Sequence, residues 1–335
     1  MSKRVLVTGA SGFVGANLGR RLVAEGHDVH LVLRSQDLNW RLTGNEDVAV
    51  HHADLRDAAS VGRAVRDIRP DWIFHLAAHG AYSSQTDVRE MVETNLAGTI
   101  NLVEACLEGG FESFVNTGSS SEYGLKDGAP AETDPLEPNS PYAVTKAAAT
   151  MYCGFAARKH GARIRTLRLY SVYGPWEEPT RLIPTLIVNG LHNRLPNLVD
   201  PKVARDFVYV DDVCDAYLAA AADTAADPDA IFNVGTGVQS SLEQVVHVAR
   251  HLLAIDAEPQ WGSMPNRVWD TTTWVADGKK IRRELGWEPR HLLEAGLSAT
   301  IDWFRAHPSL LAHYEGAEPG PTEAPTTNSR GGPGA

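Results

Sequence analysis

The chain alternates between short runs of consecutive apolar residues and longer segments in which apolar residues recur every three or four positions. Short apolar runs are typical of strands buried on both faces, and the longer periodicity is typical of amphipathic helices. Strands are expected at residues 5–7, 29–33, 48–52, 72–76, 111–116 and 164–169. Helices are expected over residues 13–25, 57–68, 86–108 and 140–160. This alternation predicts an α/β fold in which a doubly wound parallel sheet carries helices on both faces.

A glycine-rich turn joins the first predicted strand to the first predicted helix. Gly9, Gly12 and Gly15 follow the spacing G-x-x-G-x-x-G. The first glycine permits the tight turn, the second lets the backbone approach a pyrophosphate, and the third lets helix pack closely on strand. Backbone amides at the start of that helix form an anion site. A glycine triplet also occurs in turns that only pack, but its place between strand and helix predicts a Rossmann-like, dinucleotide-binding domain.

The pattern changes after residue 170, where prolines and short elements replace the regular alternation. Strands are expected at 205–209 and 231–234, and helices at 211–223, 241–254, 278–285 and 291–306. We therefore predict a dinucleotide-binding domain over residues 1–170, with its sheet completed by later strands. Residues 171–310 are expected to form a smaller α+β region that mainly binds substrate. Residues 311–335 are expected to be a disordered tail, because small and polar residues there bury little apolar surface.

Composition narrows the classes of partner and location. The 335 residues carry a formal net charge of −11, which argues against nucleic acid as a partner. The three cysteines are far apart and form no C-x-x-C motif, so neither a disulfide framework nor a metal site is expected, and a reducing compartment fits best. No apolar run approaches the ~20 residues of a membrane helix. Charged residues lead directly into the first strand without a signal peptide, so the expected location is the cytoplasm.

The ends of the second and third predicted strands bear on the choice of cofactor. A dinucleotide fold that prefers NAD usually has an acidic residue after the second strand, to bind the ribose hydroxyls. This chain has Arg34 there, which suits a 2′-phosphate and favours NADP over NAD, although a solvated arginine is the simpler interpretation. Asp54 follows the third strand and is expected to accept hydrogen bonds from adenine, with a helix N-cap as the alternative.

The strongest catalytic signal is the pair Tyr142 and Lys146. Their spacing of four residues puts a phenol and an ammonium on one face of a helix. The ammonium stabilises phenolate and is expected to lower the tyrosine pKa towards neutrality. Such a tyrosine exchanges a proton with a carbinol oxygen while hydride moves to or from a nicotinamide. A hydroxyl from the serine-rich stretch that leaves the fifth strand, at residues 119–121, is expected to share that oxygen, although a simple turn is the alternative.

Several motifs together resemble those of the extended short-chain dehydrogenase/reductases, and more closely those of the nucleotide-sugar epimerase/dehydratase family. The resemblance covers residues 3 to about 306. The motifs are the glycine turn at 8–15, His75-Leu76-Ala77-Ala78, Thr94-Asn95-x-x-Gly98-Thr99, Tyr142-x-x-x-Lys146, Arg168 with Val172-Tyr173-Gly174-Pro175, Arg205-Asp206-Phe207, Asn233-Val234-Gly235-Thr236-Gly237 and Leu285-Gly286-Trp287.

The resemblance implies roles for individual residues. Tyr142 is the acid/base, Lys146 binds the nicotinamide ribose and tunes Tyr142, and Ser119 is the partner hydroxyl. With Arg34 added, the residues expected to bind cofactor are Gly9, Gly12, Phe13, Val14, Gly15, Arg34, Asp54, Leu55, Leu76, Ala77, Ala78, Asn95, Tyr142 and Lys146. Those expected to bind a nucleotide-diphosphate sugar are Ser119, Ser120, Arg205 and Arg267, with the arginines on the diphosphate or, alternatively, in surface ion pairs.

One departure from the family pattern decides the expected reaction. The 4,6-dehydratases of the family follow their Ser/Thr with acidic residues, whereas this chain has Ser120 and Ser121 there and Glu122 one step late. A one-residue slip would bring Glu122 into the acidic position and make Ser120 the hydroxyl. We therefore expect an NAD(P)-dependent enzyme acting at C4 of a nucleotide-activated sugar, first as a 4-keto-6-deoxyhexose reductase or 4-dehydrogenase. The alternatives are a 4-epimerase, then a 4,6-dehydratase, and, in another class, a non-catalytic dinucleotide sensor.

The resemblance also implies a homodimer. In many relatives the helices equivalent to residues 86–108 and 140–160 pair across a two-fold axis as a four-helix bundle.

Overall fold

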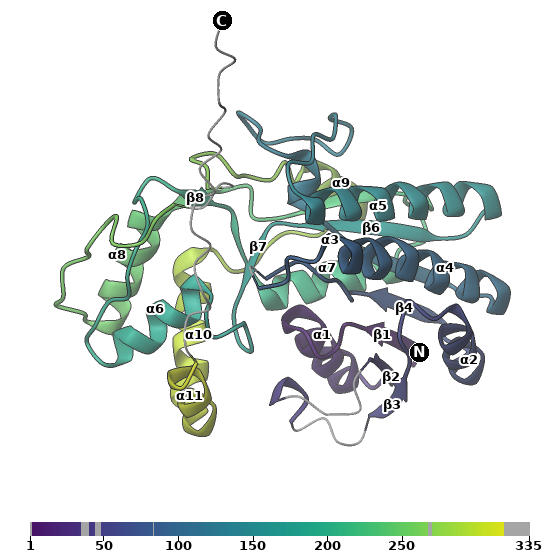
Figure 1. Cartoon of the computed structure of the whole chain (residues 1–335), viewed down its shortest axis with the longest axis horizontal. Coiled ribbons are helices and arrows are strands. Elements are labelled where there is room, and N and C mark those ends of the chain that lie inside the picture. Colours follow the sequence, from purple (N-terminus) through teal and green to yellow (C-terminus); the bar gives the residue numbers. More distant parts are fainter. Residues whose placement is uncertain (1, 35–39, 44–47, 83, 267–269, 318–335) are drawn as a thin grey trace, which may run out of the picture.

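A computed structural model describes residues 2–34, 40–43, 48–82, 84–266 and 270–317. Its main feature is a seven-stranded sheet in which neighbouring strands are all parallel (Figure 1). In spatial order the strands are β10 (Ile231–Val234), β6 (Ile164–Leu169), β5 (Ser113–Ser119), β4 (Trp72–His75), β1 (Arg4–Thr8), β2 (Asp28–Leu33) and β3 (Ala49–His52). The predicted doubly wound α/β fold is therefore confirmed.

Helices cover both faces of this sheet, as the apolar periodicity predicts. One face packs against α1 (Phe13–Ala24), α7 (Val210–Ala222) and α9 (Lys279–Leu285). The other face packs against α2 (Ala58–Ile68), α4 (Gly98–Gly109) and α5 (Pro141–His160). Phe74 is fully buried in the first core and Phe114 in the second. Successive side chains of a strand point to opposite faces of the sheet, so the strands contribute to both cores.

The strand order places the ligand-binding edge of the sheet. β1 lies between β2 and β4, so the chain winds outward in both directions from that point. Open α/β sheets bind ligands outside the carboxyl ends of their strands at this switch point. The glycine turn follows β1, and the segment from Leu76 follows β4, so both are placed at this edge.

The helix predicted over 86–108 differs from the expectation in its middle. It consists of α3 (Val88–Met91), a π-helical segment η2 (Val92–Ala97) and α4. Asn95 lies in the widened turn, where its amide donates to the His79 carbonyl at 2.8 Å and to the Thr145 hydroxyl at 3.0 Å. A periodicity of three to four residues does not distinguish such a turn from an α-helical one.

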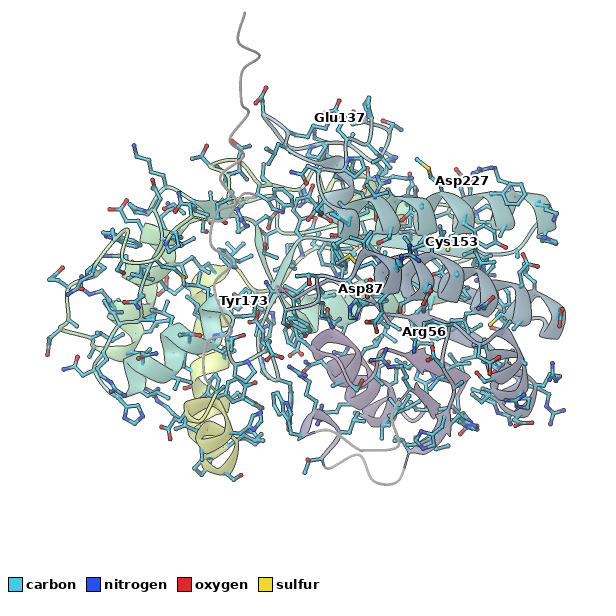
Figure 2. The ribbon with its side chains drawn as sticks, in the orientation of Figure 1. Arg56, Asp87, Glu137, Cys153, Tyr173 and Asp227 are labelled. Atoms are coloured by element: carbon cyan, nitrogen blue, oxygen red, sulfur yellow. The ribbon has the colours of Figure 1, made fainter. Side chains whose placement is uncertain are left out.

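The C-terminal region forms a third core beside the sheet. It contains four helices, two short sheets and the nearby single turns η1 and η3. The helices are α6 (Leu182–Leu191), α8 (Leu242–Leu253), α10 (Leu293–Ala306) and α11 (Pro308–Glu315); the strand pairs are β7 (Ser171–Tyr173) with β9 (Phe207–Tyr209) and β8 (Ala204–Arg205) with β11 (Ser240–Ser241); the turns are η1 (Trp40–Leu42) and η3 (Ser120–Tyr123). Tyr173 lies where this region meets the sheet domain (Figure 2) and is almost fully buried.

The disordered tail predicted over residues 311–335 was given a start that is too early. Residues up to Glu315 belong to α11, whose Tyr314 is buried and packs edge-on against Phe304. The small and polar composition that suggested disorder therefore applies only beyond this helix. Residues 318–335 lie outside the described part of the chain.

Three further observations concern the remaining sequence expectations. Cys106, Cys153 and Cys214 are all buried and form no disulfide. In the described ranges, no helix has both the length and the apolar character needed to cross a membrane. Within the same ranges, no group of three or more metal-binding side chains is placed to hold a metal ion.

Candidate active site

A cavity of about 760 Å³ opens at the carboxyl edge of the sheet, between the sheet domain and the C-terminal region. Its volume lies within the range of small-molecule and cofactor sites. The wall contains the glycine turn, the ends of β2 and β4, the start of α5 and the segment that leads into α6.

The glycine turn forms a cradle that larger side chains would fill. Gly9 has a φ of 71°, and a Cβ there would lie 2.5 Å from the Ala77 amide nitrogen. A Cβ on Gly15 would overlap the Gly9 carbonyl oxygen. Helix α1 begins after Gly12 without a side-chain cap, so its first amides have no side-chain partner. These features fit a dinucleotide pyrophosphate at the helix N-terminus.

Replacing Gly15 with alanine is expected to lower the free energy of unfolding by about 2–3 kcal/mol, because the methyl group overpacks against backbone. It is also expected to weaken NAD(P) binding at least tenfold, since the cradle must widen. Gly19→Ala is the matched control in the same helix, where the new Cβ meets only Leu31 Cδ2 at 3.8 Å. The control is expected to stabilise the protein by about 0.5–1 kcal/mol. Equal affinity in both variants, by fluorescence titration, would contradict the assigned cradle.

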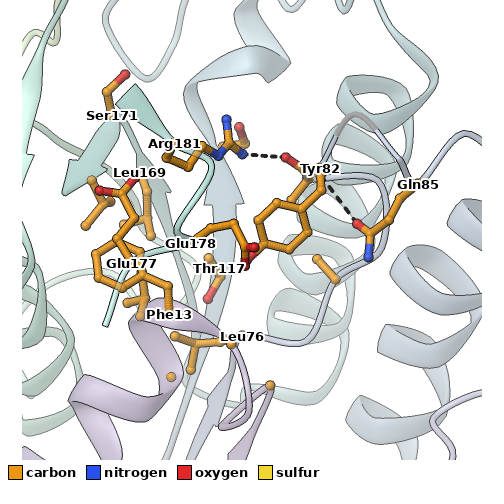
Figure 3. A pocket seen from close by; sticks show the side chains of 18 of the residues that line it. Phe13, Leu76, Tyr82, Gln85, Thr117, Leu169, Ser171, Glu177, Glu178 and Arg181 are labelled. Carbon is orange, nitrogen blue, oxygen red and sulfur yellow. Dashed lines mark hydrogen bonds between the residues drawn. The ribbon is translucent and has the colours of Figure 1, made fainter. Parts of the chain in front are cut away.

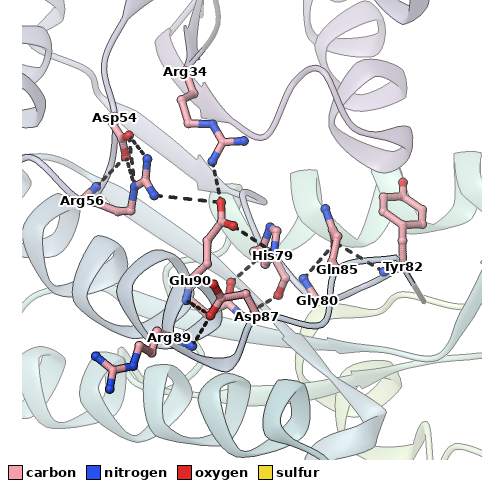
Figure 4. Close-up of polar contacts among 11 residues, drawn as sticks. Arg34, Asp54, Arg56, His79, Gly80, Tyr82, Gln85, Asp87, Arg89 and Glu90 are labelled. Atoms are coloured by element: carbon pink, nitrogen blue, oxygen red, sulfur yellow. Dashed lines mark hydrogen bonds and ion pairs between the residues drawn. The ribbon is translucent and has the colours of Figure 1, made fainter.

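Arg34 and Asp54 lie at one end of the cavity within a chain of ion pairs (Figure 4). Arg34 donates to Glu90 at 3.0 Å, and Arg56 pairs with Asp54 at 2.6 Å. His79 lies 3.4 Å from the other oxygen of Glu90. Hydrogen bonds from Arg56 lower the pKa of Asp54. Asp54 is not the N-cap of α2, which is Asp57. Asp54 lines the cavity, but both of its carboxylate oxygens already accept hydrogen bonds from Arg56.

The other predicted cofactor residues divide into two groups. Phe13, Val14, Leu55, Leu76, Ala77 and Ala78 line the cavity. Asn95 is not among the described residues of the wall. It is buried behind the wall and holds the loop that begins at His79, whose amide donates to Asn95 Oδ1 at 2.7 Å. The structure thus makes Asn95 a positioning residue.

Tyr142 and Lys146 both face the cavity from the first turns of α5. The helix begins there because Ser140 caps it, with its hydroxyl accepting from the Ala143 amide at 3.2 Å, and Pro141 occupies the first position. The predicted Tyr–Lys arrangement on one helix face is therefore present in the structure.

The electrostatics of this pair differ from the expectation. Burial and, to a smaller extent, the charge of Glu122 raise the pKa of Tyr142 to about 12, against the opposing effect of Ser119. Burial likewise lowers the pKa of Lys146, while Glu122 raises it. The sequence argument considered only the ammonium beside the phenol and neglected desolvation, which acts on both groups. The phenol of Tyr142 therefore stays protonated at neutral pH.

Two of the candidate serines, at the end of β5 and directly after it, have distinct surroundings. Ser119 lines the cavity beside Tyr142, whose pKa it lowers, and its hydroxyl lies 2.8 Å from the Ser121 hydroxyl. Ser120 is buried away from the wall formed by the described residues, and its hydroxyl accepts from the Trp274 indole at 3.1 Å. The structure thus places Ser119, and not Ser120, beside the phenol.

Glu122 is fully buried and engaged on both oxygens. One oxygen accepts from the Ser119 amide at 2.8 Å and from the Thr150 hydroxyl at 3.1 Å. The other accepts from Arg168 Nε at 2.8 Å. The carboxylate thus joins the end of β5 to α5 and β6, and it is absent from the described wall of the cavity.

Of the two arginines expected on a diphosphate, Arg205 lines the cavity and Arg267 lies outside the described residues. Arg205 pairs with Asp270 at 2.9 Å, and its guanidinium lies 5.6 Å from the centre of the Trp274 ring.

A further cluster in the cavity wall was not among the residues predicted from the sequence (Figure 3). Tyr82, Glu177 and Arg181 line it, and Arg181 donates to the Ala81 carbonyl at 2.6 Å. Gln85 accepts from the Gly80 amide at 2.8 Å and shapes the same loop. Two consecutive glutamates between prolines at 175 and 179 were an available signal.

Such a glycine cradle and Tyr–Lys helix, at one edge of a doubly wound sheet, define the class of Rossmann-fold enzymes that use nicotinamide dinucleotides. Residues 5–235 match the family model for the NAD dependent epimerase/dehydratase family, and the chain belongs to this family.

Similar proteins include members with different reactions. A dTDP-glucose 4,6-dehydratase of Streptomyces griseus is 33% identical, with 92% of this chain and 96% of that protein covered. A UDP-glucose 4-epimerase of Mycolicibacterium smegmatis is 31% identical, with 90% and 98% covered. The structure of a Thermus thermophilus UDP-glucose 4-epimerase with NAD superposes with a TM-score of 0.80, at 30% identity, over 90% of this chain and 99% of the other.

Proposed function

We propose that the protein catalyses NAD(P)-dependent oxidoreduction at C4 of a nucleotide-diphosphate sugar, most specifically reduction of a 4-keto-6-deoxyhexose or the reverse 4-dehydrogenation. The observation that carries the proposal is the meeting of Ser119, Tyr142 and Lys146 with the glycine cradle in one cavity. The bound cofactor supplies the hydride, or accepts it in the reverse direction.

In the reductive direction Tyr142 donates its phenolic proton to the C4 oxygen. The raised pKa of Tyr142 supports this role, because the phenol holds its proton at neutral pH. Ser119 positions the same oxygen through a hydrogen bond, and Lys146 stabilises the phenolate left after proton transfer.

The placement of Glu122 supports a reductase over a 4,6-dehydratase. A dehydratase needs an acid and a base next to the catalytic hydroxyl, in addition to the tyrosine. Here Glu122 is held by Arg168 at 2.8 Å, and the next position after Ser119 is a serine that binds Trp274. The register slip that would bring Glu122 into the cavity therefore receives no support.

A nucleotide-sugar 4-epimerase is the second candidate. It requires the same three catalytic residues, and the Mycolicibacterium and Thermus relatives carry that name. The two candidates differ in whether cofactor is consumed, because an epimerase returns the hydride to the same sugar.

Absorbance of the reduced nicotinamide distinguishes the two candidates. The protein is mixed with NADPH or NADH and a panel of nucleotide 4-keto-6-deoxy sugars. Stoichiometric loss of absorbance with one sugar is the expected result for the reductase and names its substrate. Loss with none of the sugars, together with epimerised product from UDP-glucose or dTDP-glucose, would replace the reductase with the epimerase.

We propose NADP as the preferred cofactor on the basis of Arg34. The ion pair of Arg34 with Glu90 argues against this preference. Arg34 and Arg56 lie 3.0 and 3.9 Å from the same Glu90 oxygen, so a 2′-phosphate would take over an arginine that now binds a carboxylate. The Thermus relative contains NAD. Dissociation constants for NADP and NAD, measured side by side by calorimetry, decide between them.

For the diphosphate we propose Arg205 and Arg267, since guanidinium groups bind phosphate oxygens in pairs. Arg205 already lies at the wall beside Asp270, and the anionic substrate would compete with that carboxylate.

We also propose a homodimer formed by α5 and the helix at 88–109. Val144, Met151 and Phe155 are each more than half exposed and share one face of α5. Val88 and Val92 extend the apolar surface on the neighbouring helix. Large exposed apolar side chains gathered on adjacent helices are typical of interfaces.

Replacing Phe155 with glutamate is expected to convert the dimer into a monomer, because the new charge would be buried at the interface. Light scattering at micromolar protein should give about half the wild-type mass. Val238→Glu is the matched control, since Val238 is equally exposed but lies in the C-terminal region. A wild-type protein that is already monomeric would contradict the proposed interface.

A further inference from the structure

Glu177 is a buried carboxylic acid in the cavity wall that the proposed mechanism does not use. It lies between β7 and α6 and is only 8% exposed. Its backbone is fixed at both ends: its amide donates to the Gly174 carbonyl at 3.3 Å, and its carbonyl accepts from the Tyr314 hydroxyl at 2.8 Å. The side chain is therefore held in place by the C-terminal region.

One oxygen of this carboxyl lacks a partner. Among the described residues, nothing hydrogen-bonds Glu177 Oε2, although the atom is shielded from solvent. Buried polar atoms almost always have partners, and an exception in a ligand cavity calls for an explanation. In Figure 3, Glu177 lies on the side of the cavity away from Tyr82 and Gln85, with the space between them.

Burial favours the neutral form of this acid, whereas most of its charged neighbours oppose it. Burial raises the pKa of Glu177 to about 8, opposed by Arg181, the Gly174 amide and Arg41, and assisted by Glu178. Three tyrosines also face it from other elements. They are Tyr82 in the loop after β4, Tyr173 on β7 and Tyr314 on α11. Because the folded-state pKa lies above neutrality, Glu177 carries a proton at pH 7 and loses it as pH rises through about 8.

We propose that Glu177 is a specificity-determining residue whose free oxygen hydrogen-bonds a hydroxyl of the substrate sugar ring. This inference rests on the proposed function, because it takes a nucleotide sugar as the ligand. A protonated carboxyl both donates to and accepts from a hydroxyl, so it recognises a neutral polyol. The same position disfavours sugars that have lost this hydroxyl, since the buried oxygen would again be unpaired.

The test compares two substitutions in calorimetric titrations with UDP-glucose, dTDP-glucose, UDP and dTDP. Glu177→Leu is expected to weaken binding of the better nucleotide sugar about tenfold, while the matching nucleoside diphosphate binds as before. Glu177→Gln keeps a donor and an acceptor and is expected to stay within about threefold of wild type. Glu258→Leu, at an exposed surface glutamate, is the control for the substitution itself.

The pH profile gives a second readout that a structural role would not change. Wild-type affinity for the nucleotide sugar is expected to fall between pH 7 and 9, whereas Glu177→Gln should be flat over that range, because the amide does not titrate. This arm applies even if the leucine variant does not fold. Equal losses for sugar and diphosphate ligands, or the same pH profile in both proteins, would overturn the role of Glu177. A wild-type protein that binds none of these ligands and consumes no reduced nicotinamide with any of the 4-keto-6-deoxy sugars would overturn the proposed function as well.

Discussion

Replacing Tyr142 with phenylalanine is expected to lower kcat by about 10³-fold, because general acid–base catalysis typically contributes 10²–10⁴-fold. The phenol faces the cavity beside Ser119 and is the group placed to give a proton to the C4 oxygen. Phenylalanine keeps the ring and its packing, so folding and cofactor affinity should change little. Steady-state kinetics with the sugar identified by the absorbance assay, together with calorimetric cofactor titration, measures both quantities.

Tyr152→Phe is the matched control for this substitution. Tyr152 is on the same helix, but its hydroxyl binds Glu104 and it is not among the described residues of the cavity wall. The control should retain kcat within about threefold. A Tyr142→Phe variant that also kept most of its activity would exclude Tyr142 as the proton donor.

Removing the Glu122 carboxyl is expected to be the most destabilising change near the site. Glu122→Ala leaves the buried Arg168 guanidinium without its counter-charge, which typically costs about 3–5 kcal/mol. Denaturant unfolding followed by circular dichroism measures the loss. Because Glu122 also binds the Ser119 amide and the Thr150 hydroxyl, kcat should fall in the folded fraction of the variant as well.

An exposed ion pair provides the control for Glu122. Glu258 pairs with Arg250 at 2.8 Å at the surface, so Glu258→Ala should cost less than about 1 kcal/mol. A double variant, Glu122→Leu with Arg168→Met, should recover part of the stability, since neither charge is then buried. A loss below about 1 kcal/mol in Glu122→Ala would show that the pair is open to solvent and does not organise the site.

The predicted sheet was correct because its signals are local. A short run of consecutive apolar residues identifies a strand buried on both faces, as at residues 5–7, which lie within β1. The glycine turn could be assigned for the same reason, since its spacing describes a steric requirement within ten residues of chain. The tail was placed too early because Tyr314 is stabilised by contacts with Phe304 and with the carbonyl of Glu177, which lie far away in the sequence or in another element.

The candidate site was predictable in part for a similar reason. Helical spacing alone puts Tyr142 and Lys146 on one face. Their pKa values could not be inferred in the same way, because burial depends on every element that closes the cavity. The choice between Ser119 and Ser120 required knowing that Trp274 reaches across 154 residues to bind the second serine.

By itself, the sequence determined the fold class, the family resemblance, the glycine turn and the placement of Tyr142 and Lys146 on one helix face, since each follows from residues close together in the chain. Only the tertiary structure decided that Glu122 is bound to Arg168, that Asn95 supports a loop behind the cavity wall, and that Glu177 lies in the cavity wall with one oxygen that has no partner among the described residues. The physical reason is that a carboxyl or amide takes its role from its burial and its partners. Here those partners come from strands and helices that are distant in sequence and adjacent only in the folded protein.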